Sequence, residues 1–266
     1  SADPAERVAG LSALASVGES EVLDQLLASL TDPSVEVRLE ALRALAAESG
    51  AFSVGPLVAV LRDAEPRVRA AAIDVIADVE DEEALPHLLT ALDDPSEAVR
   101  NRTRKALGRM RSPATVELLL GAIERPAHRA VAVEALGELG EVATPHLLRA
   151  LTDSEGEIRT AIRDALLRSG IVERMLRELE NPRPARRKAA LGVFRAIRPV
   201  GIAAAVVGRL SDPAPEVRLE AAHLLGELGD PAAVPALQDA FVADPDMDVV
   251  AAVETAYRRL SGEESR

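Results

Sequence analysis

Two stretches of the chain, "LTDPSVEVRLEAL" at residues 30–42 and "LSDPAPEVRLEAA" at residues 210–222, are nearly the same phrase. Weaker copies of its Asp-Pro pair recur at spacings of 28 to 32 residues. The series is Asp3-Pro4, Asp32-Pro33, Asp63-Ala64, Asp94-Pro95, Arg125-Pro126, Asp153-Ser154, Asn181-Pro182, Asp212-Pro213 and Asp244-Pro245. A period near 30 accommodates two helices and two turns, which is the unit of a helical-repeat protein.

The phrase also predicts where the second helix of each unit begins. An Asp side chain accepts hydrogen bonds from the free N–H groups of a first helical turn, and Pro is tolerated at the first helical position. After the phrase, apolar residues recur at helical spacing, as at Val37, Ala41 and Leu45. This i, i+4, i+8 spacing indicates one buried stripe per helix, repeated at residues 68, 72 and 76 and at residues 217, 221 and 225.

Shorter helices with a recurring proline precede these second helices. The prolines lie near the start of each first helix, and glycines mark the turns between helices; they are Pro56, Pro86, Pro145 and Pro235, with Gly50, Gly140, Gly170 and Gly229. We therefore predict an all-α fold: an α-solenoid of about eight helical hairpins forming one domain over residues 1–266. An unpaired helix at 3–17 precedes repeats at about 20–48, 52–79, 82–110, 113–139, 141–169, 170–197, 199–228 and 231–261.

The stretches "DPSVEVRLEALRAL" from Asp32 and "DPAPEVRLEAAHLLGELGDPAAVPAL" from Asp212 resemble HEAT repeats, and most closely their phycobilisome-lyase-like branch. The resemblance implies a hydrogen-bonded ladder between repeats, built from the Asp that starts each second helix and an Arg six residues later. The implied members are Asp32, Arg38, Asp63, Arg69, Asp94, Arg100, Asp153, Arg159, Asp212 and Arg218, with Asn181 and Arg187 as a variant. Arg125 and Ala132 interrupt the ladder, and we expect a local change of curvature around residues 124–133.

Composition excludes some classes of function. The chain has no Cys, so disulfides and thiolate chemistry are absent, and its net charge of −13 disfavours general binding to nucleic acid or anionic membrane. The absence of a signal segment or a run of 18 apolar residues favours a cytoplasmic location. The chain begins at Ser1, and we interpret its unpaired first helix as the remainder of a pair whose first member was removed.

Candidate chemistry is sparse. The four His residues have no partners at metal-ligand spacing, and the acidic run "DVEDEE" from Asp78 lacks the spacing and glycine of a calcium loop. The "GELG" segments at Gly137 and Gly226 are interpreted as helix ends, and no nucleophile, phosphate-loop or zinc-protease motif is present. We predict no catalytic residues, no cofactor and no metal site.

The outward face of the second helices is the candidate binding surface, because the resemblance places these helices on the concave side of the solenoid. Its middle is basic and includes both Lys residues, in "NRTRKALGRMR" and "PRPARRKAA", whereas its ends are apolar. The candidate partner-binding residues are Leu39, Leu42, Arg43, Ile73, Arg104, Lys105, Arg163, Lys188, Arg195, Leu219 and His223. Two alternatives remain open: the charges are solvated and paired with acids on adjacent helices, or the apolar residues lie in contacts between repeats.

The leading hypothesis is a non-enzymatic scaffold that binds a protein segment, such as an acidic one, along this face. A bilin-lyase-like accessory protein is an alternative carried by the resemblance alone, with one Tyr and three Phe as its few aromatic residues. A helical-repeat protein that binds nucleic acid is more remote. The sequence does not indicate an oligomeric state.

Overall fold

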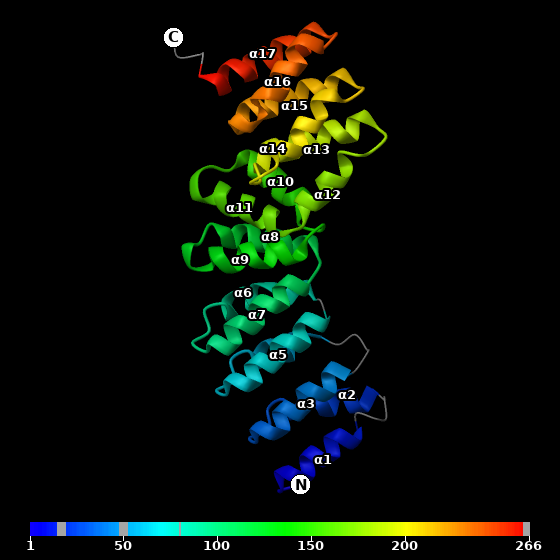
Figure 1. The fold of residues 1–266 in the computed structure, drawn as a ribbon. Helices are drawn as coiled ribbons and strands as arrows, with labels where there is room; N and C mark the ends of the chain where they lie inside the picture. The colour runs from blue at the N-terminus through cyan, green and yellow to red at the C-terminus, as the bar shows by residue number, and fades with distance from the viewer. Residues whose placement is uncertain (15–19, 48–52, 80, 263–266) are drawn as a thin grey trace. The chain divides into compact units, whose positions relative to one another are not determined.

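The computed structural model describes residues 1–14, 20–47, 53–79 and 81–262. These residues form seventeen α-helices, three 3-10 helices and no strand, as the ribbon in Figure 1 shows. The chain divides into two compact units, Ser1–Ser169 (unit 1) and Gly170–Arg266 (unit 2). The prediction of an all-α solenoid is confirmed.

Unit 1 contains one unpaired helix and five helical hairpins. The helices are α1 (Pro4–Leu14), α2 (Ser20–Ser29) with α3 (Val35–Ala47), α4 (Gly55–Val60) with α5 (Pro66–Val79), α6 (Leu85–Ala91) with α7 (Glu97–Arg109), α8 (Pro113–Ile123) with α9 (Pro126–Leu139), and α10 (Thr144–Asp153) with α11 (Gly156–Arg168). A 3-10 turn, Glu82–Ala84, precedes α6. The expected helix end at Val17, the repeat boundaries at 48 and 52, Gly50 and Glu80 lie outside the described residues.

Unit 2 contains three further hairpins. They are α12 (Ile171–Glu178) with α13 (Pro184–Ile197), α14 (Ala203–Val207) with α15 (Pro215–Leu228), and α16 (Val234–Ala243) with α17 (Met247–Ser261). The 3-10 helices Gly208–Ser211 and Pro231–Ala233 follow α14 and precede α16. The eight expected hairpins are all present, each with a first helix and a second helix.

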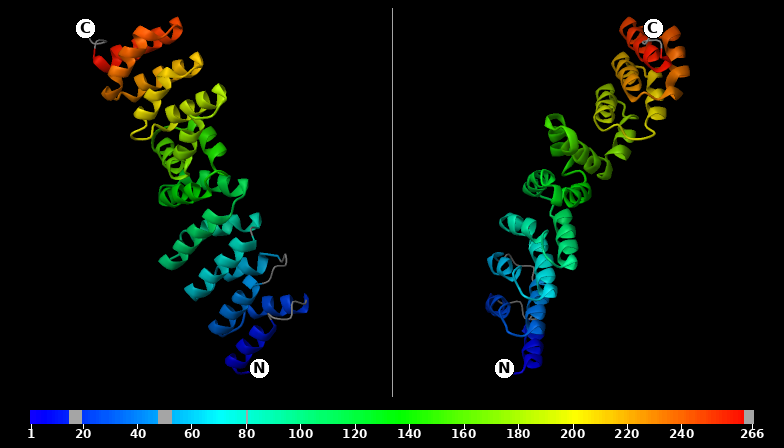
Figure 2. Two further views of the ribbon diagram at one scale, coloured as in Figure 1. Left: turned by 45° about the vertical axis from the view of Figure 1, so that its right-hand side comes forward. Right: turned by 90° about the vertical axis from the view of Figure 1, so that its left-hand side faces the viewer.

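The second helices stack on one another through the predicted apolar stripe. Within unit 1, α1 packs on α3, α3 on α5, α5 on α7, α7 on α9, and α9 on α11. The right-hand view of Figure 2 shows first and second helices of the early hairpins as two layers. Val37, Ala41 and Leu45 are each at most 1% exposed. A two-helix unit is too small to cover its own apolar face, so burial between neighbouring units stabilises a stack of this kind.

Most of the second helices begin later than the sequence predicts, α9 excepted. Helix α3 starts at Val35, and the Asp32 side chain accepts the N–H of Ser34 at 2.8 Å rather than an N–H within the helix. The predicted helix cap is therefore wrong at Asp32, because its side chain closes a two-residue turn over Pro33 before the helix begins. The same turn recurs at Asp63, Asp94, Asp212 and Asp244.

The prolines of the first helices and the described glycines of the turns lie where they were predicted. Pro56, Pro86, Pro145 and Pro235 lie in the first turn of α4, α6, α10 and α16, where no helical hydrogen bond is lost. Gly140, Gly170 and Gly229 have positive φ angles of 57°, 73° and 71° at the turns between helices.

Two glycines within second helices allow close packing. A Cβ at Gly137 in α9 would lie 2.6 Å from the Cβ of Arg168 in α11, and one at Gly226 in α15 would lie 3.1 Å from Ala256 in α17. Both "GELG" segments therefore end a helix, as predicted, and their first glycine brings the next second helix close.

Candidate functional site

Arginine–aspartate rungs link successive repeats at the N-terminal ends of the second helices. Arg69 in α5 donates from Nη1 to the carbonyl of Asp63 at 2.7 Å, six residues before it. Its Nε and Nη2 donate to the two carboxylate oxygens of Asp94, 25 residues after it, at 2.7 and 2.8 Å. One guanidinium therefore hydrogen bonds to the backbone of its own turn and forms a bidentate ion pair with the Asp in the turn of the next repeat.

Five such rungs are found among the described residues: Arg7–Asp32, Arg38–Asp63 and Arg69–Asp94 in unit 1, and Arg187–Asp212 and Arg218–Asp244 in unit 2. The ion pairs join each Arg to the Asp of the following repeat, whereas the residue six positions earlier contributes only its carbonyl. That residue is Asp for Arg38, Arg69 and Arg218, Ser1 for Arg7 and Asn181 for Arg187. Arg7 and Asp244 were missed as members. The 25-residue spacing from Arg7 to Asp32 is the signal that could have found the first of them.

The pKa values of four rung carboxylates, those of Asp32, Asp94, Asp212 and Asp244, are lowered. The hydrogen bond from Arg69 and the N–H of Ser96 lower the pKa of Asp94 against the opposing effect of burial. For Asp212, burial is the largest single influence and raises the pKa, but Arg187 and the N–H of Ala214 together outweigh it, and the net shift is downward. The pKa values of Asp32 and Asp244 are lowered in the same way, by Arg7 and Arg218 first.

The ladder is interrupted at α8–α9, but not in the way predicted. Arg129 donates from Nε to the carbonyl of Ile123, six residues earlier, and from Nη1 to the exposed Glu157. Arg129 therefore holds the ladder position assigned to Ala132, which is buried in the apolar stripe. The assignment was wrong because α9 begins three residues after Ile123 without a separate Asp turn, which shifts the register.

A different contact bridges the interruption. His128 in the first turn of α9 is 5% exposed, and its Nε2 hydrogen bonds to Asp93 at 2.7 Å. Further along, Arg159 donates to the carbonyls of Leu151 and Ser154 rather than to that of Asp153, at which α10 ends. The Asn181 variant keeps the anchoring half of a rung, since its carbonyl accepts from Arg187 at 2.8 Å.

The apolar candidates on the outward face divide into two groups. Leu42 and Ile73 are 1% and 0% exposed, so they pack between helices and cannot contact a partner. For these two residues the alternative of contacts between repeats is correct. Leu39 and Leu219 are half-buried and remain available.

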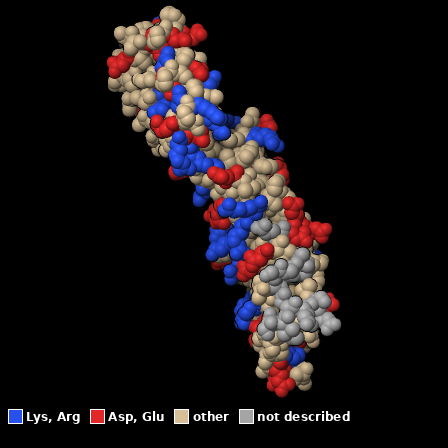
Figure 3. Space-filling view, turned by 90° about the vertical axis from the view of Figure 1, so that its right-hand side faces the viewer, with Lys and Arg blue, Asp and Glu red and all other residues tan. Residues whose placement is uncertain are grey.

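Several basic candidates form ion pairs within the stack. Arg43 pairs with Glu40, Arg104 with Glu134 of the next second helix, and Arg195 with Glu220. Nearby, Arg102 and Arg109 lie 3.4 and 4.0 Å from Asp74. Burial raises the pKa of Asp74 even though both arginines lower it. Pairing with an acid on an adjacent helix is therefore found for Arg104 and Arg195, whereas Arg43 pairs within its own helix. Figure 3 shows acidic side chains interspersed with clusters of basic ones.

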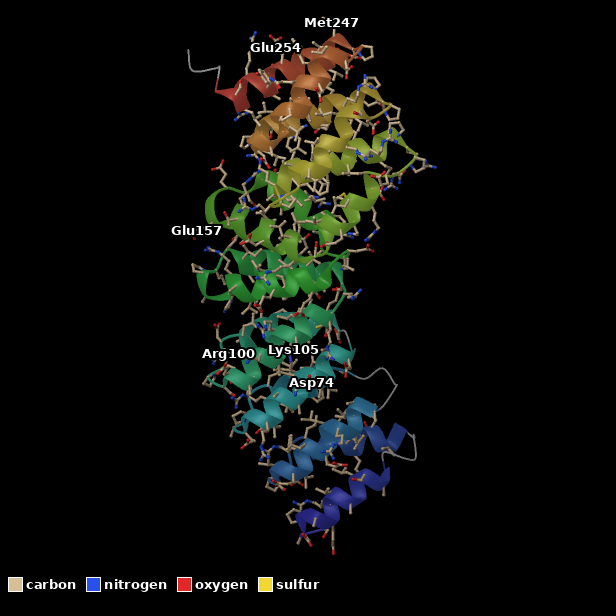
Figure 4. The ribbon with its side chains drawn as sticks, in the orientation of Figure 1. Asp74, Arg100, Lys105, Glu157, Met247 and Glu254 are labelled. Carbon is tan, nitrogen blue, oxygen red and sulfur yellow. The ribbon has the colours of Figure 1, made fainter. Side chains whose placement is uncertain are left out.

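The two lysines are different. Lys105 and Lys188 are exposed, and the structure gives neither of them an ion pair within the described ranges. Figure 4 shows Lys105 on α7, with Asp74 on the neighbouring α5. Arg163 is half-buried and His223 is exposed. An open pocket of about 480 Å³ lies on unit 1, lined by Arg104, Glu134, Gly137, Glu138 and Arg168.

Other candidate sites give little chemistry. No three His, Asp or Glu side chains of the described part of the chain converge as metal ligands. None of the described helices is both long enough and apolar enough to cross a membrane. In unit 2 a pocket of about 420 Å³ is lined by Gln238, Phe241, Val242, Glu254, Tyr257 and Arg258.

Stacked two-helix repeats joined by Arg–Asp rungs define the chain as a helical-repeat solenoid. It belongs to the HEAT-repeat family: a model described as HEAT repeats matches residues 54–128, 92–167 and 172–258. A second model, described as a HEAT repeat associated with sister chromatid cohesion, matches residues 14–39. HEAT repeats generally mediate protein–protein interactions. The phycobilisome-lyase-like branch stays a prediction, as do the bilin-lyase and nucleic-acid alternatives.

Three solved structures are similar to the chain. Human deoxyhypusine hydroxylase in complex with glycerol is 20% identical, with a TM-score of 0.39, and the match covers 91% of this chain and 96% of that one. An engineered protein is 19% identical (TM-score 0.42; 98% and 86% covered), and Kap121p is 12% identical (TM-score 0.47; 98% and 36% covered). At these TM-scores the similarities carry no residue roles to this chain. A search of curated proteins finds no match.

Proposed function

We propose that the protein is a non-enzymatic scaffold that binds an acidic segment of a partner protein through the outward face of its second helices. The observation that carries the proposal is the state of the two lysines. Arg104 and Arg195 on this face are engaged by Glu134 and Glu220, whereas Lys105 and Lys188 are exposed and lack ion pairs among the described residues.

On unit 1, the second helices also line a pocket near this surface. Lys105 follows Arg104, which lines the pocket together with Arg168. Glu134 and Glu138 share this pocket, so the local charge is mixed although two cations line it. Mixed charge of this kind favours selection among partners and their orientation more than raw affinity, and it makes binding sensitive to salt.

The test is capture of partner proteins by the immobilised full chain and by Lys105→Glu. We expect the variant to lose at least about tenfold of a specific partner, because it places a carboxylate where the partner's carboxylate binds. Lys105 is preferred to Arg104 for this substitution, since the Arg104–Glu134 pair also links α7 to α9.

Arg62→Glu is the matched control. Arg62 is exposed in the turn after α4, outside the second-helix face, and it forms no ion pair with any described residue. Its charge reversal changes the net charge as Lys105→Glu does, and we expect it to leave capture unchanged. Equal recovery by wild type, Lys105→Glu and Lys188→Glu would exclude the proposed surface.

A further inference from the structure

The interruption of the ladder leaves one arginine in an unusual state. In each of the five rungs found among the described residues, one edge of the guanidinium donates to backbone carbonyls of its own turn, and the other edge binds the carboxylate of the next repeat. At Arg187, for example, Nη1 donates to the carbonyls of Asn181 and Pro182, and Nε and Nη2 donate to the carboxylate of Asp212 at 2.7 and 2.6 Å. The carbonyl contacts, here called the anchor, set the orientation of the guanidinium plane, and the next repeat supplies the carboxylate.

Arg100 in α7 has the same anchor. Its Nη1 donates to the carbonyl of Asp94 at 2.7 Å and to that of Pro95 at 3.0 Å, as Arg69 does to Asp63 and Ala64. The guanidinium of Arg100 is therefore held as in a complete rung, although the side chain is only half-buried. Figure 4 shows it beside the N-terminal end of α7, at the edge of the stack.

The Nε and Nη2 of Arg100 have no carboxylate partner within the described part of the chain. The residue 25 positions later, where complete rungs have Asp, is the exposed Arg125. The residue six positions before the next ladder arginine is Ile123, whose side chain is fully buried. Two acids in the turn before α7 are engaged by other side chains, since Asp94 binds Arg69 and Asp93 binds His128. Glu97 and Glu124 are exposed, and neither forms an ion pair with Arg100 among the described residues.

We propose that the free Nε and Nη2 of Arg100 form a binding site for a carboxylate group of a partner, which takes the place of the missing Asp. The proposal rests on the proposed function, because it names a second point at which an acidic partner segment binds. In five rungs of the same molecule, an Asp carboxylate occupies the equivalent position beside the ladder arginine. A planar guanidinium binds carboxylate bidentately, and an oriented one has already lost much of its rotational freedom on folding. Arg125 adds a second positive charge on the turn before α9.

The experiment follows the side-chain Nε–Hε NMR signals of the full chain during titration with N-acetyl-aspartate N-methylamide at constant ionic strength. Arg100→Lys assigns the signal of Arg100 by removing it. We expect a saturable shift of the Arg100 signal and no saturable shift of the signal of Arg62, an exposed arginine without this anchor. We also expect Arg125→Gln to weaken binding about two- to threefold through loss of one exposed charge.

Two outcomes would overturn the proposal: an Arg100 signal that does not saturate, and one that moves in parallel with that of Arg62. Methyl phosphate is titrated in a second arm, and tighter binding of phosphate than of the aspartate probe would overturn the assignment to carboxylate. The NMR probe requires no identified partner, so the Arg100 site and the proposed scaffold function are tested independently. Loss of the Arg100 site leaves capture through Lys105 standing, and failure of capture leaves the NMR result standing.

Discussion

At the scale of the residue, one arginine makes two kinds of contact. The backbone carbonyls that accept from Nη1 are local, and the carboxylate that accepts from Nε and Nη2 belongs to the next repeat. Hydrogen bonds between charged groups contribute roughly 1.5–3 kcal/mol each when water is largely excluded. Arg69 and Asp94 meet this condition, with side chains 10% and 9% exposed.

Most of these residues could be predicted from the sequence, but their pairing could not. The six-residue spacing from Asp to Arg pointed to the right side chains, and it is the spacing of the carbonyl contact. The carboxylate contact spans 25 residues and depends on how closely the next repeat packs, which local spacing does not encode. Arg129 was missed because the turn before α9 is short, so that the ladder arginine lies earlier in the sequence than expected.

At the scale of the element, the second helices are predictable in their stripe and less so in their starts. Val37, Ala41 and Leu45 were correctly assigned to the core, because a period of four residues places them on one face. The start of α3 was placed too early, because Asp32 can close a turn as well as cap a helix. The burial of Leu42 and Ile73 was left open, since each lies outside the i, i+4, i+8 stripe of its helix; both are buried in the structure.

The packing of one helix against the next yields a test with a matched pair of glycines. Gly137→Ala places a methyl group 2.6 Å from the Cβ of Arg168, an atom close to the backbone that cannot easily move away. We expect it to lower the free energy of unfolding by about 1–3 kcal/mol, as overpacking does. Gly121→Ala in α8 meets no atom within 4 Å and should raise this free energy by about 0.5–1 kcal/mol through helix propensity. Urea unfolding measures both, and equal effects of the two substitutions would contradict the close approach of α9 and α11.

At the scale of the whole molecule, the rungs make stability depend on acidity in both units. The pKa values of Asp32, Asp94, Asp212 and Asp244 are lower in the folded chain than the ordinary value of about 3.9. Their stabilisation is therefore complete above that value and is lost as the pH falls through the lowered values. Asp74 acts in the opposite sense because its pKa is raised, but it is one carboxyl against four.

We therefore expect the Tm to fall as the pH is lowered from about 5 to about 2. Asp94→Asn removes one titrating carboxylate from a rung and should make this fall smaller. Asp239→Asn, at an exposed residue with no ion pair among those the structure describes, should leave it unchanged. Thermal scans followed by circular dichroism across this range measure the effect, and identical profiles for Asp94→Asn and wild type would argue against rung carboxylates as its source.

Function was the least predictable level. Periodicity and composition were sufficient for a solenoid and for a protein partner as its expected ligand, because both follow from many repeated residues. The binding surface depends on which side chains remain unpaired after folding. Lys105 and Arg104 are adjacent in sequence and alike in charge, yet Glu134 pairs with only the arginine in the described structure.

The most direct test of the central claim is a double-mutant cycle on the Arg69–Asp94 rung. Arg69→Ala, Asp94→Ala and the double variant are unfolded in urea, with the exposed pair Arg67–Glu65 of the same hairpin as the control cycle. We expect a coupling free energy of about 2 kcal/mol or more for Arg69–Asp94 and below about 0.5 kcal/mol for Arg67–Glu65. A coupling at Arg69–Asp94 no larger than that of the control pair would contradict the claim that these rungs join the repeats.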